Sequence, residues 1–132
     1  MEKSLILETT FLIDLEREHR QIKGGPAHNV LKQLTYHRLF ITDIIAGELA
    51  AGKSLSDRDK WERFIGRFRI LVINDNAAWE YGKLFRYLKQ NRLLIGSNDL
   101  WIAATALAYD VPVVTRNVEH YRRVPGLKVL GY

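Results

Sequence analysis

Four oxygen-bearing side chains stand out because each lies where an apolar strand ends or a helix begins or runs. Glu8 follows a short apolar run, and Glu48 lies in the helix expected after the next strand. Asp99 opens an apolar helical stretch, and Asn117 follows a later strand. In an open parallel α/β sheet, residues at the carboxyl ends of the strands converge on one crevice. Converging acids hold Mg²⁺ or Mn²⁺ through oxygen ligands, so the pattern predicts a metal-dependent phosphodiesterase.

Each of these residues has an ordinary structural alternative when it is taken alone. Glu48 lies beside the apolar side of its helix but could reach solvent or pair with a nearby lysine. Asp99 could serve only the helix dipole, and Asn117 could cap the helical turn that follows it. Glu8 could bond to the start of the next helix. None of these alternatives predicts that the four side chains meet in space. The ordered occurrence of all four residues at strand ends and helix starts therefore favours a common site.

The elements that must position these side chains alternate between strands and helices. Apolar runs predict strands at 5–7, 39–42, 69–73, 111–115 and 129–130. Helical spacing predicts helices near 11–19, 27–36, 43–51, 57–68, 75–90 and 99–109, with a short turn around 120–121. Because the strands are apolar without alternation, the sheet should be parallel and covered on both faces. We therefore expect one domain over residues 1–132, a three-layer α/β/α sandwich with about five parallel strands.

Composition limits the classes of function. The chain has 132 residues, 47% of them hydrophobic, and it contains no cysteine, which excludes disulfides, thiolate metal sites and a cysteine nucleophile. This composition fits a cytoplasmic protein. The longest apolar stretch, 100–109, is too short to cross a bilayer, and the four histidines lack zinc-ligand spacing. The net charge of +5 fits a polyanionic partner, but acids facing phosphate need a cation between them.

Four segments together resemble a known family. Residues 5–14 (LILETTFLID) look like the opening of a PIN domain, and Glu48-Leu49 matches its second acidic motif. Residues 98–104 (NDLWIAA) match the third motif. Residues 115–127 (TRNVEHYRRVPGL) closely resemble the closing motif of VapC-type toxins. The motifs are in the family's order and span nearly the whole chain.

The resemblance implies a fold, a reaction and partners. It implies a PIN-like fold, an Mg²⁺- or Mn²⁺-dependent endoribonuclease that leaves a 5′-phosphate and a 3′-hydroxyl, a silencing VapB-like antitoxin, and a homodimer. The expected metal ligands are Glu8, Glu48 and Asp99. The expected catalytic set is Glu8, Glu48, Asp99, Asn117 and Thr115. Basic residues near the closing motif are expected to bind RNA phosphates: Arg116, Arg122 and Arg123.

Two positions depart from the family's pattern. Glu8 stands where the first motif normally carries Asp, and its extra methylene moves the carboxylate by about one bond length, whereas metal sites tolerate about ±0.2 Å. Asn117 stands where Asp is often found. Glu8 keeps open an alternative, a catalytically weakened PIN-fold module that binds RNA or another partner. A phosphoacceptor receiver domain would need an acidic pair and a late lysine that are not evident, whereas an RNA-processing nuclease without an antitoxin shares the predicted chemistry.

Two further features have ordinary interpretations. The aromatic residues at helical spacing in 57–68, Trp61, Phe64 and Phe68, indicate core, although an exposed part of this stripe could form a groove for the antitoxin. Asp14 is expected on a helix surface or in a salt bridge with Arg17.

Overall fold

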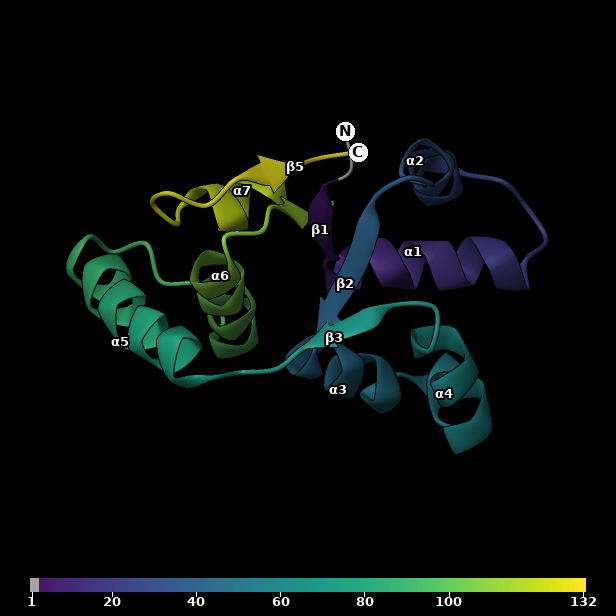
Figure 1. The fold of residues 1–132 in the computed structure, drawn as a ribbon, viewed down its shortest axis with the longest axis horizontal. Helices are drawn as coiled ribbons and strands as arrows, with labels where there is room; N and C mark the ends of the chain where they lie inside the picture. The colour runs from purple at the N-terminus through teal and green to yellow at the C-terminus, as the bar shows by residue number, and fades with distance from the viewer. Residues whose placement is uncertain (1–2) are drawn as a thin grey trace.

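Five parallel strands form one sheet in the computed structural model, which describes residues 3–132 (Figure 1). The strands are β1 (Ser4–Leu7), β2 (Arg38–Thr42), β3 (Arg69–Leu71), β4 (Val113–Val114) and β5 (Val129–Leu130). Their order across the sheet is β3-β2-β1-β4-β5, and every pairing is parallel. This confirms the predicted parallel sheet. Met1 and Glu2, the start of the expected domain, lie outside the described residues.

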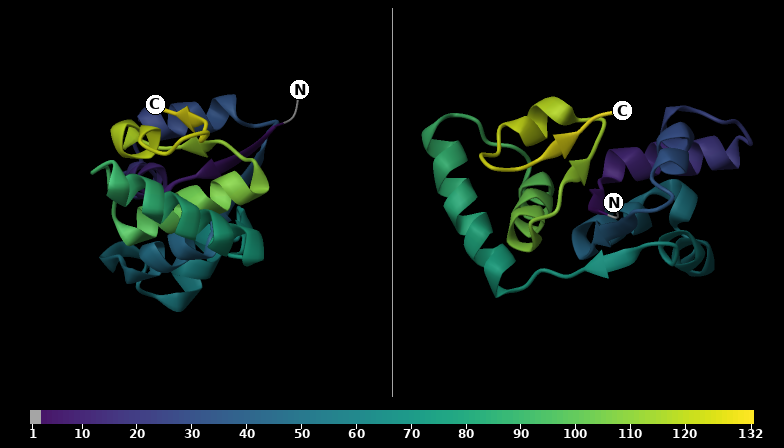
Figure 2. Two further views of the ribbon diagram at one scale, coloured as in Figure 1. Left: turned by 90° about the vertical axis from the view of Figure 1, so that its left-hand side faces the viewer. Right: turned by 45° about the horizontal axis from the view of Figure 1, so that its top comes forward.

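Helices cover both faces of the sheet. They are α1 (Thr9–Arg20), α2 (Pro26–Gln33), α3 (Asp43–Ala51), α4 (Arg58–Ile65), α5 (Asp75–Gln90), α6 (Ser97–Tyr109) and α7 (Val118–Arg122), with a short turn η1 (Lys53–Leu55). In Figure 1, α5 and α6 lie on one side of the strands and α1 and α2 lie on the other. The two further views in Figure 2 show the same layering. The predicted α/β/α sandwich is therefore confirmed.

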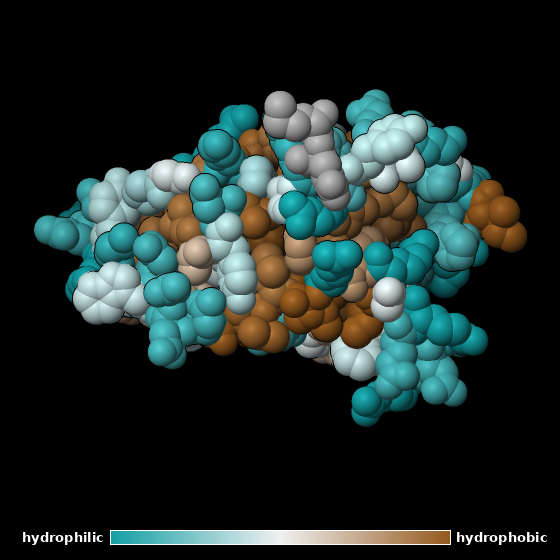
Figure 3. Space-filling view, viewed as in Figure 1, coloured by the Kyte–Doolittle hydropathy of each residue, from teal (hydrophilic) through white to brown (hydrophobic). Residues whose placement is uncertain are grey.

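The core lies between the central strand and the helices of each face. β1 is buried almost throughout, and α6 buries Leu100 and the run 102–106 because its sequence is apolar nearly all round. Polar residues cover α4, while apolar residues gather across the middle of the face that Figure 3 shows. Among residues 3–132, no helix is both long and apolar enough to cross a membrane.

The strand order creates a topological switch point between β1 and β4. From β1 the chain runs outward through β2 and β3, and it then returns across β1 to form β4 and β5. The carboxyl ends of β1 and β4 therefore flank the point where the order reverses, where α/β proteins bind ligands. Leu7 pairs with Val114 in register, and the Glu8 amide donates to the Val114 carbonyl at 2.9 Å.

Several element ends differ from the predicted ones for local reasons. α1 begins at Thr9 rather than near residue 11, because Glu8 acts as its N-cap. α2 ends at Gln33 rather than near residue 36, since Thr35 turns back and donates its hydroxyl to the Lys32 carbonyl. β4 is shorter than predicted, and Pro112 before it has no amide hydrogen to pair.

Candidate active site

Glu8 lies below the surface at the end of β1, with only 2% of the residue exposed. Its carboxylate caps α1 by accepting from the Thr10 amide at 3.1 Å and the Thr10 hydroxyl at 2.7 Å. The Thr115 hydroxyl, which follows β4, also donates to it. The expected bond from Glu8 to the next helix is therefore present, and the same carboxylate also joins β1 to β4.

Hydroxyl groups continue this network into the loop after β4. The Thr10 hydroxyl lies 3.2 Å from that of Thr115 and accepts from the Arg116 amide at 3.1 Å. The Thr115 hydroxyl in turn accepts from the Asn117 amide at 2.9 Å. Thr115 is fully buried, so its hydroxyl fixes the path of this loop beside Glu8.

Glu48 approaches the same crevice from the second turn of α3, and it is partly buried. One carboxylate oxygen accepts from the Thr9 hydroxyl at 2.7 Å, and the other accepts from the side-chain amide of Asn98 at 3.4 Å. Glu48 thus connects α3 with the starts of α1 and α6.

Asp99 lies in the first turn of α6, where the helix dipole favours its negative charge. Gly96 is the N-cap of α6, so neither Ser97 nor Asn98 fills that position. The Asp99 side chain is 25% exposed, and its Oδ1 accepts from the Tyr121 hydroxyl at 3.2 Å. Its Oδ2 lies 3.8 Å from His120 Nδ1.

Asn117 stands at the N-cap position of α7, as its ordinary alternative anticipates, but its side chain makes no capping bond there. Its amide nitrogen lies 2.9 Å from His120 Nδ1 instead. Through His120, Asn117 is therefore joined to the surroundings of Asp99.

Burial dominates the electrostatics of Glu8 and Tyr121. Burial raises the pKa of Glu8, the hydrogen bonds from Thr115 and Thr10 counteract part of that rise, and the charge of Asp99 adds to it. The pKa of Tyr121 is raised by burial, then by the charges of Glu8 and Asp99, the hydrogen bond to Asp99, and the charge of Glu48. The fold therefore brings all three acids into electrostatic reach of one buried hydroxyl.

The donors match a hard divalent cation in chemical type. Three carboxylates supply oxygen ligands and three negative charges, which Mg²⁺ or Mn²⁺ prefers. Within residues 3–132, however, no three acidic or histidine side chains already form a closed group around one point. A cation would therefore need small side-chain movements, above all by Glu8, which the threonines hold.

The basic residues expected at the site lie in two situations. Arg116 bonds to both carboxylate oxygens of Asp14, at 2.8 and 3.1 Å, while 55% of its side chain is exposed. Arg122 and Arg123 are exposed, at the end of α7 and just after it.

Asp14 is 4% exposed, so its expected surface position is wrong, whereas its salt bridge with Arg17 is confirmed at 2.9 Å. Tyr132 also donates its hydroxyl to Asp14.

Sequence reasoning missed several members of the network. Three of these residues bond to the acids directly: Thr9, Thr10 and Asn98. Each lies within two positions of Glu8 or Asp99 in the sequence, and this nearness could have pointed to them. Tyr121 gave no such signal, because it lies 22 positions from Asp99 in the sequence and meets it only in the fold.

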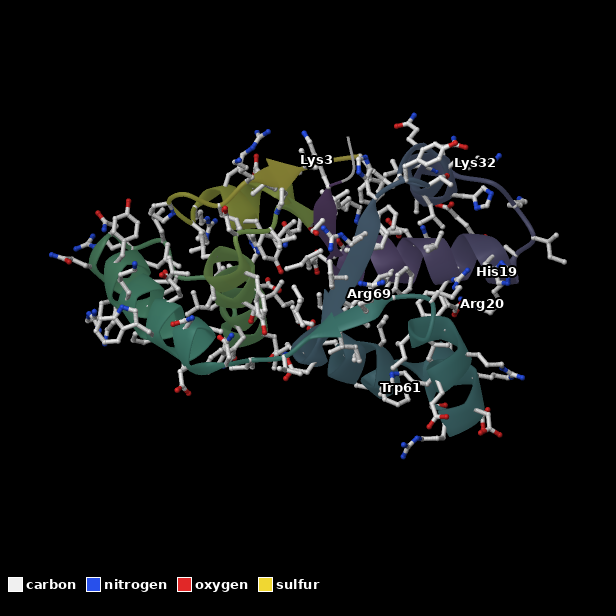
Figure 4. The ribbon with its side chains drawn as sticks, viewed as in Figure 1. Lys3, His19, Arg20, Lys32, Trp61 and Arg69 are labelled. Atoms are coloured by element: carbon white, nitrogen blue, oxygen red, sulfur yellow. The ribbon has the colours of Figure 1, made fainter. Side chains whose placement is uncertain are left out.

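A groove of about 500 Å³ lies between α1 and α4, away from the acids. Phe64 and Phe68 are buried, which confirms their expected place in the core, and Phe64 also lines the groove. Figure 4 shows His19 and Arg20 at the end of α1 that faces α4. The cationic lining residues are Arg20, Lys60, Arg63 and Arg67.

Known proteins share this fold and sequence. The sequence pattern of the PIN domain matches residues 5–127. Ribonuclease VapC from Rickettsia bellii is 32% identical over 134 aligned residues, covering 96% of this chain and 94% of that protein. VapBC2 from Rickettsia felis, solved bound to a DNA fragment from their promoter, gives a TM-score of 0.84 at 27% identity and covers 98% of each chain. DNA-bound VapBC from Salmonella typhimurium gives 0.75 at 28% identity, covering 99% of this chain and 98% of that one.

The fold, the acids at the switch point and these similarities define a nuclease class of protein. The chain belongs to the PIN domain family and, within it, to the VapC-type ribonuclease toxins of VapBC toxin–antitoxin systems. The resemblance seen in the sequence motifs is thereby confirmed.

Proposed function

We propose that this single-domain chain is a cytoplasmic, metal-dependent endoribonuclease, the toxin of a type II toxin–antitoxin pair. The observation that carries the proposal is the meeting of three acids from three separate elements at the switch point. Glu8 follows β1, Glu48 lies on α3 and Asp99 lies on α6, yet Glu48 bonds to Thr9, the neighbour of Glu8, and to Asn98, the neighbour of Asp99. The proposed catalytic set is Glu8, Glu48, Asp99, Asn117 and Thr115.

The acids would hold Mg²⁺ or Mn²⁺, and such an ion lowers the pKa of water and polarises a phosphoryl oxygen. Glu48 and Asp99 are the acids with exposed area, so they face the substrate side, and Glu8 supports them from below. In the proposed hydrolysis, a water oxygen bonds to phosphorus and the bond to the 3′ oxygen breaks. The 3′ oxygen takes up a proton, leaving a 3′-hydroxyl and a 5′-phosphate.

Basic side chains beside the acids would hold the RNA backbone. Arg116, Arg122 and Arg123 follow β4, at the same edge of the sheet as the acids. Asp14 holds the Arg116 guanidinium from beneath while more than half of the side chain stays exposed. This arrangement fixes Arg116 without covering it, as binding to phosphate through the remaining N–H groups requires.

Cleavage of structured RNA tests the proposal. The chain should cut a fluorescent RNA panel in Mn²⁺ or Mg²⁺ and not in EDTA. Asp99→Ala should lower the rate by more than about 100-fold, because it removes a direct oxygen ligand. Folding of the variant is checked by circular dichroism, with Asp110→Ala, an acid at the other end of α6, as the matched control.

Glu8→Asp separates the proposal from its alternative. The structure favours that alternative in one respect, because hydroxyl and amide donors already occupy the Glu8 carboxylate. Cutting by Glu8→Asp alone would identify an attenuated toxin. RNA binding without cutting by either folded protein would contradict the proposal and favour the non-catalytic module.

We also propose an antitoxin of VapB type as partner, docked in the groove between α1 and α4. The solved relatives from Rickettsia felis and Salmonella typhimurium are VapBC structures. In this chain, Lys60, Arg63 and Arg67 line the groove around an apolar floor of Leu55 and Phe64, whereas Arg20 is paired with Glu16 at 3.1 Å. Arg67 lies 5.0 Å from the Phe64 ring centre. Such a groove fits an acidic amphipathic segment. A homodimer is proposed as well, with the exposed apolar residues Ile70 and Val72 available for a second copy.

A further inference from the structure

Tyr121 is a buried aromatic residue beside Asp99, one of the acids of the proposed set. It lies on α7 with no exposed surface, and its hydroxyl donates to Asp99 Oδ1 at 3.2 Å. A phenyl ring would fill nearly the same volume in this packed position. The hydroxyl therefore adds little to the packing of the core, and burying it among acids costs free energy unless it is bonded.

The bond has a direct effect on the orientation of Asp99. Asp99 has two rotatable side-chain torsions and lies in the first turn of α6, where a quarter of its side chain is exposed. Tyr121 fixes one oxygen from the buried side, and the other oxygen lies 3.8 Å from His120 Nδ1. Groups that bond to a ligating carboxylate orient it, and their loss commonly lowers metal affinity by about 10- to 100-fold.

We propose that Tyr121 is a positioning residue, whose buried hydroxyl holds the Asp99 carboxylate in the orientation that binds the divalent cation. The inference rests on the proposed function. The short helix α7 brings this hydroxyl to Asp99 in the first turn of α6. Tyr121 has no access to RNA, so it acts through Asp99 alone.

The test measures Mn²⁺ binding to the folded full chain, without RNA. Isothermal titration of wild type and Tyr121→Phe should show about a 10-fold or larger loss of affinity in the variant. Tyr109→Phe is the matched control, because Tyr109 also bonds through its hydroxyl, to the Val72 carbonyl at 3.0 Å, and lies at the far end of α6 from Asp99. This control should bind Mn²⁺ as wild type does.

A double-mutant cycle shows whether the effect passes through Asp99. In an Asp99→Ala background, Tyr121→Phe should change the residual Mn²⁺ affinity by less than about 2-fold. RNA affinity in EDTA should be the same for wild type and Tyr121→Phe, which a general disturbance of the fold would not give.

Three outcomes oppose the inference, and they can be told apart. Equal Mn²⁺ affinity of wild type and Tyr121→Phe overturns the positioning role and leaves the proposed function intact. An undiminished effect of Tyr121→Phe in the Asp99→Ala background overturns the route through Asp99. A wild-type chain that binds no Mn²⁺ and cuts no RNA overturns the proposed function and this inference with it.

Discussion

Glu8 is a carboxylate held below the surface by hydroxyl groups. Its threonine partners come from α1 and from the loop after β4, so the acid that departs from the family's usual Asp is also a structural tie. The longer side chain can reach back to cap α1 and across to Thr115 at the same time. This reach accounts for how the fold accommodates Glu at the end of β1.

The raised pKa of Glu8 predicts a pH-dependent stability. The folded protein binds this proton more tightly than the unfolded chain, whose carboxyl has the ordinary value of 4.5. The Glu8 contribution to the free energy of unfolding is therefore greatest below that value and falls as pH rises towards the raised pKa, by up to about 1.4 kcal/mol per pH unit. Glu8→Gln should remove this fall, as measured by urea unfolding in EDTA across the acidic to neutral range.

An exposed acid provides the comparison for this experiment. Glu119→Gln changes the same charge on the surface of α7 and should leave the wild-type pH dependence in place. Parallel curves for wild type and Glu8→Gln would contradict the buried, desolvated state of this carboxyl.

At the scale of residues, the sequence revealed the acids but not their supports. Glu8, Glu48 and Asp99 could be proposed because polar residues next to apolar runs mark strand ends and helix starts. Tyr121 could not, because its hydroxyl meets Asp99, 22 positions away in the sequence, only through the fold. The sequence shows an aromatic residue in a short helix, and core packing explains such a residue equally well.

Among the elements, α3 depends most visibly on its cap. Thr42 ends β2, is fully buried, and accepts from the Ile45 amide at 3.1 Å through its hydroxyl. The cap fixes where α3 begins and hence where Glu48 lies one and a half turns later. Trp61 on α4 supports the same helix by donating its ring N–H to the Ala46 carbonyl at 2.9 Å.

Removal of this cap should destabilise the protein. Thr42→Ala should lower the free energy of unfolding by about 1 to 2 kcal/mol, because the Ile45 amide loses its acceptor in a buried place. Thr42→Ser keeps the oxygen and loses only a methyl group, so it should lose clearly less. Urea unfolding of the three proteins measures the difference. Equal losses for the two variants would assign the effect to packing instead of capping.

Element bounds were predictable where a local signal marks both ends. The bounds of α3, 43–51, were predicted as observed, since Thr42 caps one end and Gly52 follows the other. The end of α2 was not, because Leu34 continues the apolar spacing while its amide already shares two carbonyls in a tightening turn. The spacing of apolar residues alone does not reveal that the helix ends there.

Across the whole molecule, the proposed catalytic and antitoxin surfaces are at opposite ends of α1. Glu8 precedes the first turn and Arg20 ends the last, about 18 Å apart along the axis. An antitoxin seated between α1 and α4 would therefore need a further segment to reach the acids, or would silence them by covering their approach.

Charge reversal in the groove should separate inhibition from cleavage. Arg63→Glu with Arg67→Glu should leave RNA cutting near the wild-type rate and weaken inhibition by the proposed VapB-like antitoxin by about 100-fold, through repulsion of an acidic segment. Arg86→Glu with Lys89→Glu makes the same charge change on α5, outside the groove, and should leave inhibition unaltered. Cleavage titrated with antitoxin measures both effects. Full inhibition of the groove variant would place the antitoxin elsewhere.

The convergence of the site could be anticipated, but the strand order that produces it could not. Alternation of apolar strands with helices indicates a parallel sheet, whereas many orders of five strands satisfy the same alternation. The pairing of Leu7 with Val114 joins residues more than one hundred positions apart. No local pattern specifies such a contact, since it follows from the packing of both helical layers.

The central place of β1 between β2 and β4 has a consequence for synthesis. During translation, Glu8, Glu48 and Asp99 are all made before β4, yet Glu8 gains its Thr115 bond only when β4 aligns beside β1. Domains fold while the ribosome adds about 5–20 residues per second, and sheets built from distant pairings form late. A nascent chain therefore lacks the finished site until β4 and the loop after it have emerged from the ribosome.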